Sequence, residues 1–413
     1  MTPLQKYFLK LMRPCRHYTA CLHREFSVDN QKDGAKNTKD QNNNQEDNDN
    51  NTKSDVKVCI VGGGVTPLYT AVLLKQYRII KSINLVDMEG STSAVGAMKD
   101  AFHEETNPRI NYFGKQNMKQ AFKEVDIVAL MDETDAMTDS NNLAPRKQFQ
   151  LSVDYVRQMA DQMLRFCPGA LVAVFARPVT ATLAMISEIF KSSGCSNPDR
   201  IIGSAAAYKA RVEETAATLL NFERVSLSVP IVGGADESTV VPLLSRAVPF
   251  NQFTNAQRQS LLQSFRTDEN GEITKTFFRY RSSLSSGTAA MSLLTALAGG
   301  LCGYDNIITC AYMRSDVLPV CRFFTSELQL GVNGVKRNLG LPKISPAEIL
   351  LIEQAIPLIN EYVDMAFAAV RTKRIQQKGS ARNILQICLI DLQVLLSSNK
   401  IIHRCLYMKN NYF

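Results

Sequence analysis

The length, composition and charge of the chain indicate a two-domain globular protein with charged tails. The 413 residues are enough for two ordinary domains, and 45% hydrophobic and 21% charged residues are close to globular averages. The net charge of +8 comes from +4 in residues 1–28, −3 in residues 29–55 and +7 in residues 371–413. Residues 56–370 are therefore electrically neutral and give no indication of a nucleic-acid-binding surface.

The cysteines and the apolar runs predict neither a disulfide framework nor a membrane span. Ten cysteines are scattered along the chain without a C-x-x-C pair, which indicates free thiols in a reducing compartment. Cysteine and histidine are close neighbours only in the two tails, so we expect no metal site. The best apolar run, residues 384–396, is too short for a span and is interrupted by Gln386 and Asp391.

The two ends of the chain have the composition of a leader and of unstructured segments. The first 24 residues contain no acid, and their Lys and Arg residues alternate with apolar ones. This pattern is typical of a mitochondrial transit peptide, predicted here over residues 1–28; the alternative is an untargeted leader. Residues 29–55 hold eight asparagines and alternating charges, which predicts a disordered linker. Residues 371–413 form a basic extension without a domain pattern.

Residues 56–200 alternate apolar, β-branched runs with segments of helical periodicity. Continuous apolar strands separated by helices are typical of an α/β fold, a parallel sheet covered on both faces. The expected strands are residues 56–64, 83–89, 125–133 and 170–178, and the clearest helices are residues 149–166 and 180–191.

Residues 201–370 have a different pattern, which predicts a smaller C-terminal α+β domain. A helix is expected over residues 206–220, a strand over 225–234 and a helix of small residues over 284–300. Ser345-Pro346-Ala347-Glu348 is a capping box with proline at the first helical position, and it opens a helix to about residue 370.

Three glycines at the end of the first strand indicate a dinucleotide-binding, Rossmann-type fold. Gly62, Gly63 and Gly64 would let the backbone approach a pyrophosphate at a helix N-terminus, and Asp87 would bind ribose hydroxyls. The third glycine of the fingerprint is missing, because Pro67 or Leu68 stands in its place, depending on how the fingerprint is counted.

Three longer segments resemble the mitochondrial-type malate dehydrogenases. "FCPGALVAVFARPVTATLAMISEIFKSSGCSNPDRIIG" is similar to the region of that family's Asn-Pro-Val-Asn motif, and "SVPIVGGADESTVVPLLS" to the stretch with its Gly-Gly-His. "LGVNGVKRNLGLPKISPAE" resembles the family's strand pair before the last helix. The resemblance covers most of residues 56–370 and implies a Rossmann-type doubly wound sheet, a substrate domain and NAD as cofactor.

The same resemblance implies that the catalytic pair is absent. The proton-transferring histidine of the family falls on Ala235, and its aspartate partner falls on Tyr208. Of the four histidines, only His103 lies in the predicted folded region, close after the second strand, where it is expected to face solvent or a helix. Reduction of a 2-oxo acid needs a proton donor with a pKa near the working pH.

The substrate-binding arginines are also reduced in number. One of the family's three falls on Arg211 and is retained. A second falls on Ala136, and no arginine occurs from residue 110 to 145. The third falls on Pro145, although a shift of one residue would place Arg146 there.

The loop after the strand over 125–133 has become acidic. Asp132, Glu133, Asp135 and Asp139 would repel an anionic cofactor and substrate, unless they form only a solvated loop. Arg177 stands at the first asparagine of the family's Asn-Pro-Val-Asn motif. It could bind a different carboxylate, or pair with the acidic loop and plug the site; the second is favoured.

Three functions are compatible with these residues. The first is a pseudoenzyme with a structural or partner-binding role, in which NAD binding through Gly62, Gly64 and Asp87 is doubtful. The second is an oxidoreductase with altered chemistry, acting on malate, oxaloacetate or another 2-hydroxy acid through Tyr208. The third, an active enzyme completed by a partner subunit, is the least favoured.

The resemblance also predicts a subunit interface. A homodimer, or a heterodimer with an active paralogue, would use the helices over 149–166 and 206–220. Without a partner, the apolar residues of these helices would leave a large exposed patch; they include Met163, Leu164, Ala216 and Leu219.

Overall fold

The computed structural model describes seven segments of the chain. They are residues 55–90, 108–134, 145–195, 197–221, 227–249, 253–265 and 283–372. The predicted leader, the linker up to residue 54 and the extension from residue 373 lie outside these segments. His103, Ala136, Asp135 and Asp139 lie outside them as well.

A single eleven-stranded sheet runs through the described chain. Its strand order is β3-β2-β1-β4-β5-β6-β9-β10-β7-β8, with β11 paired to β10. The first six strands pair in parallel, which confirms the predicted α/β, doubly wound sheet. These strands are β1 (Val56–Gly62), β2 (Ile80–Asp87), β3 (Arg109–Gly114), β4 (Ile127–Leu130), β5 (Leu171–Val174) and β6 (Ile201–Ser204).

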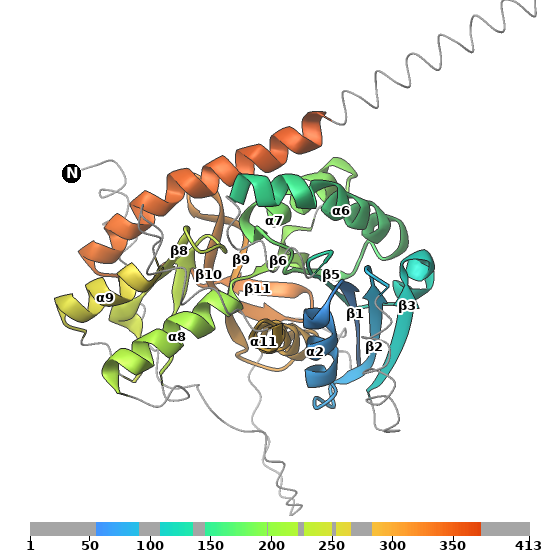
Figure 1. Cartoon of the computed structure of the whole chain (residues 1–413), viewed down its shortest axis with the longest axis horizontal. Helices are drawn as coiled ribbons and strands as arrows, with labels where there is room; N and C mark the ends of the chain where they lie inside the picture. Colours follow the sequence, from blue (N-terminus) through green and yellow to red (C-terminus); the bar gives the residue numbers. More distant parts are fainter. Residues whose placement is uncertain are drawn as a thin grey trace, which may run out of the picture.

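Helices cover both faces of the parallel part (Figure 1). Alternate residues of β1 explain this, because Cys59 and Val61 belong to one buried cluster, and Val58 and Ile60 to another. The first cluster is completed by α6 (Pro145–Phe166) and α7 (Val179–Ser192), and the second by α2 (Val65–Leu74) and α11 (Ser283–Leu301).

The C-terminal half extends the same sheet with antiparallel strands. β9 (Ile308–Leu318) pairs with β6 and forms a long hairpin with β10 (Cys321–Gly331). The remaining elements are β7 (Ile231–Gly233), β8 (Val240–Pro242), β11 (Gly334–Asn338), α8 (Ala206–Leu220), α9 (Asn255–Phe265), α4 (Met118–Ala121), a helix over residues 346–372, and the short helices η1 (Lys115–Asn117), η3 (Pro198–Arg200) and η5 (Leu244–Arg246). The domain boundary expected between residues 200 and 201 stays a prediction. β6 lies just after that position and still belongs to the parallel sheet.

The strand expected over residues 225–234 is shorter in its described part, residues 227–234. There only Ile231–Gly233 forms β7, with an isolated bridge from Ser228 to Val248. Pro230 separates the two, and a proline cannot donate to a strand ladder.

The predicted capping box at the start of the last helix is confirmed. The buried Glu348 carboxylate accepts hydrogen bonds from Ser345 N at 2.7 Å and Ser345 Oγ at 2.8 Å. It also accepts from Ser245 N at 2.9 Å and Ser245 Oγ at 2.6 Å, within η5. One carboxylate therefore joins the last helix to the segment after β8.

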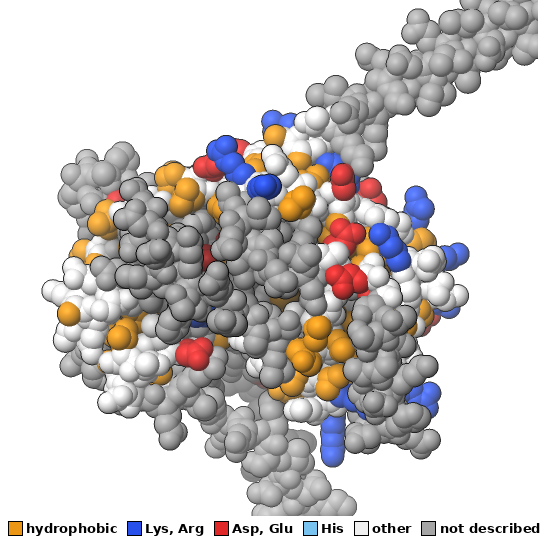
Figure 2. Space-filling model, in the orientation of Figure 1, with side chains coloured by type: hydrophobic (Ala, Val, Ile, Leu, Met, Phe, Trp, Pro, Cys, Tyr) orange, Lys and Arg blue, Asp and Glu red, His pale blue; other side chains and the backbone are white. Residues whose placement is uncertain are grey.

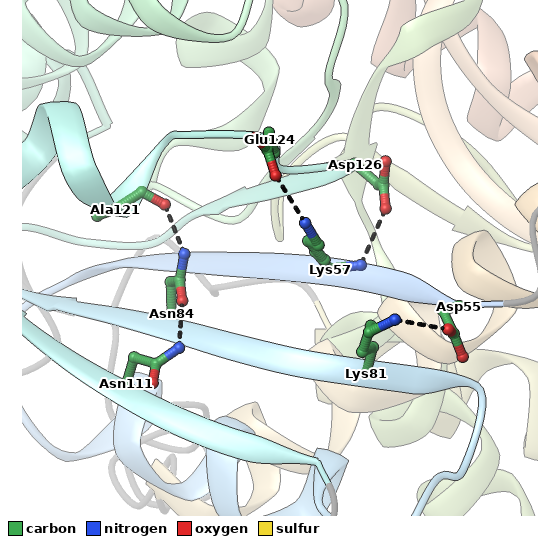
Figure 3. A network of polar contacts seen from close by, with 8 residues as sticks. All are labelled: Asp55, Lys57, Lys81, Asn84, Asn111, Ala121, Glu124 and Asp126. Carbon is green, nitrogen blue, oxygen red and sulfur yellow. Dashed lines mark hydrogen bonds and ion pairs between the residues drawn. The ribbon is translucent and has the colours of Figure 1, made fainter.

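Polar contacts at the amino ends of the strands fix the register of this edge (Figure 3). Lys57 N donates to Asp126 Oδ2 at 2.9 Å, and Lys57 Nζ to Glu124 Oε2 at 3.0 Å, which ties β1 to the approach to β4. Lys81 forms an exposed ion pair with Asp55, 2.9 Å from Nζ to Oδ2.

The prediction that Met163, Leu164, Ala216 and Leu219 form an exposed apolar patch is wrong. Met163 and Ala216 are fully buried inside the chain, and Leu164 and Leu219 pack against the same core. The reason is that α6 packs on α7 and is tied to the last helix, where Arg157 donates to the Ala369 carbonyl at 2.8 Å.

Within the described segments, no helix combines the length and the apolar character that a membrane span requires. These segments also contain no group of three or more His, Cys, Asp or Glu side chains arranged to hold a metal ion.

Candidate functional site

A cleft opens at the carboxyl ends of β1, β4, β5 and β6. The strand order reverses between β1 and β4, and ligands of doubly wound sheets bind at such a switch point. α11, from the C-terminal half, contributes one wall and packs against α2 (Figure 1). The described residues that line the cleft are Gly63, Thr66, Pro67, Met131, Asp132, Phe175, Arg177, Val179, Ser204, Ala207, Tyr208, Ser286, Ala289 and Ala290.

The glycine turn lies against the chain's own loop after β4. Gly63 N donates to the Asp132 carbonyl at 3.0 Å, so this amide already has a partner. A Cβ placed on Gly63 would lie 2.1 Å from the Glu133 carbonyl oxygen, far closer than any real Cβ contact. Gly64 precedes α2 with φ of 78°, a conformation that favours glycine. The glycines thus permit a close approach, and the group that approaches Gly63 is Glu133.

Side chains fill the positions where the third glycine was missing. Pro67 is buried, and its Cγ would lie 3.1 Å from a Cβ placed on Gly62. Leu68 is buried in the cluster under α2. The side chains of Pro67 and Leu68 therefore fill space in the first turn of α2 that a glycine would leave open.

Asp87, at the end of β2, is held by three donors of the protein. Its Oδ1 accepts from Glu89 N at 2.9 Å and Gly90 N at 3.1 Å. Its Oδ2 accepts from Tyr112 Oη on β3 at 2.6 Å. Burial, and then the hydrogen bond to Asp87, raise the pKa of the Tyr112 phenol well above its usual value. The phenol thus stays protonated and keeps donating to the carboxylate.

Arg177 and Asp132 form a nearly buried ion pair across the ends of β5 and β4. Asp132 Oδ2 lies 2.8 Å from both Nε and Nη2 of Arg177, and Asp132 Oδ1 accepts from Arg177 N at 2.8 Å. The two side chains are only 11% and 13% exposed. The structure thus shows the contact of the second alternative for Arg177, pairing with the acidic loop.

The two described acids of the loop do not face the cleft as free charges. Besides Asp132, Glu133 has a cationic neighbour, with Lys115 Nζ at 3.8 Å from its Oε1. The expectation of unpaired carboxylates that repel an anion is therefore corrected for these two residues. Tyr155 on α6 fixes the start of the loop by donating to the Met131 carbonyl at 3.0 Å.

The loop over residues 234–239 is closed against the start of α7. Ala235 is fully buried, and its N donates to Thr180 Oγ1 at 3.1 Å. The buried Asp236 carboxylate accepts from Val179 N at 2.9 Å and Thr180 N at 2.8 Å, so it occupies the N-terminus of α7.

Comparison with known proteins gives one consistent relationship. Residues 56–203 match the model of the NAD-binding domain of lactate/malate dehydrogenase. The mitochondrial malate dehydrogenase of Sus scrofa is 28% identical over 314 residues, 74% of this chain and 89% of the relative. The enzyme of Caenorhabditis elegans is 26% identical over 322 residues, 76% of this chain and 91% of the relative.

The chain is therefore similar to the lactate/malate dehydrogenase family, over residues 56–203 for the family model and over about three quarters of its length for the relatives.

Solved malate dehydrogenase structures share the fold of this chain. A malate dehydrogenase from Plasmodium falciparum superimposes with a TM-score of 0.62 at 13% identity, covering 76% of this chain and 99% of that one. One from Picrophilus torridus gives a TM-score of 0.63 at 14% identity, covering 77% and 99%.

The residues that the resemblance assigns to the family's site do not all lie at the cleft. Tyr208 lines the cleft, as Arg177 does. Arg211 lies one turn further along α8, half-buried and outside the set of described residues that line the cleft. Arg146 follows Pro145 in the first turn of α6, and its Nε donates to Glu361 Oε1 on the last helix at 2.7 Å. The one-residue shift therefore does not bring a guanidinium to the cleft.

Two contributors to the site were missed from the sequence. Asp236 follows Gly-Gly-Ala directly, and an acid beside that motif was the available signal. Tyr112 gives no local signal, because its contact with Asp87 depends on the pairing of β2 with β3.

Proposed function

We propose that this chain is a non-catalytic relative of malate dehydrogenase with a structural or partner-binding role. One observation carries the proposal: the position assigned to the proton-transferring histidine is a buried methyl group, Ala235, in a loop closed by Asp236. Three described residues that line the cleft can ionise, namely Asp132, Arg177 and Tyr208. Asp132 is bound to Arg177, which leaves the Tyr208 phenol as the candidate proton donor.

Weak or absent NAD binding is part of this proposal. Among the described residues, the groups that a cofactor would need already contact the protein's own groups. They are the glycine turn, the acid expected to bind ribose, and the cation of the cleft. Gly63 contacts Asp132 and Glu133, Asp87 contacts Tyr112, and Arg177 contacts Asp132. A cofactor would have to displace these contacts before it gained its own.

The mitochondrial matrix is the compartment that supports the proposal best. The relatives named above are mitochondrial malate dehydrogenases, and residues 1–28 have the acid-free, basic composition of a transit peptide. A homodimer, or a heterodimer with an active paralogue, would give such a subunit a function without chemistry.

Steady-state assay of the purified full chain tests the proposal. We expect malate oxidation and oxaloacetate reduction below an active relative by several orders of magnitude, since loss of the acid/base group alone removes ~10²–10⁴. Ala235→His should remain inactive, because its partner position is Tyr208. Turnover near ~10 s⁻¹ by the unmodified chain would overturn the proposal.

The second candidate is an oxidoreductase with altered chemistry, favoured only by the place of Tyr208 in the cleft. A residual activity that Tyr208→Phe abolishes and Tyr304→Phe leaves intact would support it. Tyr304 is a suitable control, since it is a partly exposed tyrosine outside the described lining of the cleft.

A further inference from the structure

Backbone donors at the turn between β5 and α7 are bound by the chain's own carboxylates. Asp132 takes the N–H of Arg177, and Asp236 takes the N–H groups of Val179 and Thr180, while Pro178 has none. Such a turn at a helix N-terminus attracts anions. Here two side chains from other elements supply the negative charge.

Asp132 also reaches the opposite wall of the cleft through its backbone. Its carbonyl accepts from Gly63 N at 3.0 Å, while its carboxylate binds the Arg177 guanidinium. A single residue therefore contacts both the glycine turn before α2 and the turn before α7. Both turns present backbone donors at the cleft.

The charge of Asp132 is the part of this arrangement that can be removed alone. Asparagine has the same shape, retains an oxygen for the Arg177 amide and keeps the backbone contact with Gly63. It would leave the Arg177 guanidinium with an uncharged partner in place of the carboxylate. Because the two groups are almost buried, little solvent screening weakens the resulting attraction for an anion.

We propose that Asp132 sets the charge selectivity of the cleft: its carboxylate acts as an internal anion that excludes phosphate-bearing ligands. Pyrophosphate and dinucleotides are the excluded class, because their phosphates would bind at the glycine turn and be attracted by the guanidinium. This inference rests on the proposed function, in that it explains why the cleft would not take up NAD.

Two variants of opposite charge test the inference in the full chain. Calorimetric titration with inorganic pyrophosphate and with NADH should show at least about tenfold tighter binding by Asp132→Asn than by the unmodified chain. Arg177→Gln, which leaves the carboxylate without its guanidinium, should bind no more tightly than the unmodified chain. The gain in Asp132→Asn should shrink as salt is raised.

The matched control is Asp55→Asn, which removes an acid from the exposed ion pair with Lys81 at the other edge of the sheet (Figure 3). It changes the net charge by the same amount, so its affinity for pyrophosphate should stay within about twofold of the unmodified chain. If Asp132→Asn does not fold, Asp132→Ser removes the same charge and gives the same readout.

Equal affinities for Asp132→Asn and Asp55→Asn would overturn the inference, and so would tight pyrophosphate binding by the unmodified chain. These titrations measure no turnover, so they separate the inference from the proposed function. Malate turnover by the unmodified chain would refute the function, whereas a failed gain of anion binding would refute only the role of Asp132.

Discussion

Gly63 illustrates how one residue can keep its identity while its contact changes. A glycine at the end of β1 is expected to make room for a pyrophosphate, yet here the space beside it holds the Glu133 carbonyl. The absence of a Cβ is required for packing within the chain, whether or not a nucleotide ever binds. At this position, a retained glycine is therefore weak support for cofactor binding.

Gly63→Ala should lower the free energy of unfolding by roughly 1–3 kcal/mol, the usual cost of overpacking a well-filled site. The added methyl would meet a backbone oxygen at 2.1 Å, and a backbone atom cannot move aside as a flexible side chain does. Urea denaturation without nucleotide measures the change. Gly169→Ala is the control, since a Cβ there meets nothing within 4 Å. Equal stability of the two variants would show that the 132–133 loop moves away at little cost.

At the scale of an element, the Glu348 carboxylate holds two segments of the fold together. It closes the N-terminus of the last helix and also binds the Ser245 amide and hydroxyl, about 100 residues earlier in the chain. That helix also contacts α6 near its carboxyl end, where Arg157 donates to the Ala369 carbonyl. Loss of the carboxylate would thus loosen a helix and a β8 connection together.

Glu348→Ala should cost roughly 2–4 kcal/mol of stability, because it removes a cap and leaves partly buried donors without an acceptor. Asp364→Ala on the same helix is the matched control: its partner Arg322 is half-exposed and such surface pairs contribute about 0–1 kcal/mol. Thermal unfolding of both variants compares them. A loss for Glu348→Ala no larger than that of the control would contradict this role.

Local patterns were the predictable part of the fold and of the site. The capping box is predictable because Ser345 and Glu348 are three residues apart, and four of the six parallel strands are predictable from their apolar runs. β3 and β6 were not among the expected strands. Gly62 and Asp87 were placed correctly at strand ends, but what binds them was not predictable. Asp236 meets amides 56–57 residues earlier in the chain, a contact that no local pattern encodes.

At the scale of the whole molecule, dimerisation stays a prediction, although the apolar residues first expected to form the interface are buried inside the chain. Met163 and Ala216 are interior residues, so they cannot form an interface. α2 instead shows Tyr69 at 39% and Val72 at 37% exposure, one turn apart. Figure 2 shows hydrophobic side chains gathered over this helix. This pair of residues is the place to test for a subunit contact.

Sedimentation of the full chain at micromolar concentration should give twice the single-chain mass. Val72→Asp, which places a charge on the apolar face of α2, should shift the chain to a monomer. Leu151→Asp is the control, an exposed apolar residue on α6, away from that helix. A single-chain mass for the unmodified protein would end the prediction, and equal effects of the two variants would remove α2 from consideration.

The pairing of β6 with β9 has a consequence for how the protein is made. Gly203 and Ser204 pair with Tyr312 and Ala311, more than 100 residues later in the chain. Until a ribosome has synthesised β9, a process of roughly 5–20 s at ordinary elongation rates, the edge of β6 has open hydrogen-bonding groups. Open strand edges are where nascent chains associate with one another. The emerging N-terminal half should therefore depend on chaperones during synthesis more than the finished protein does.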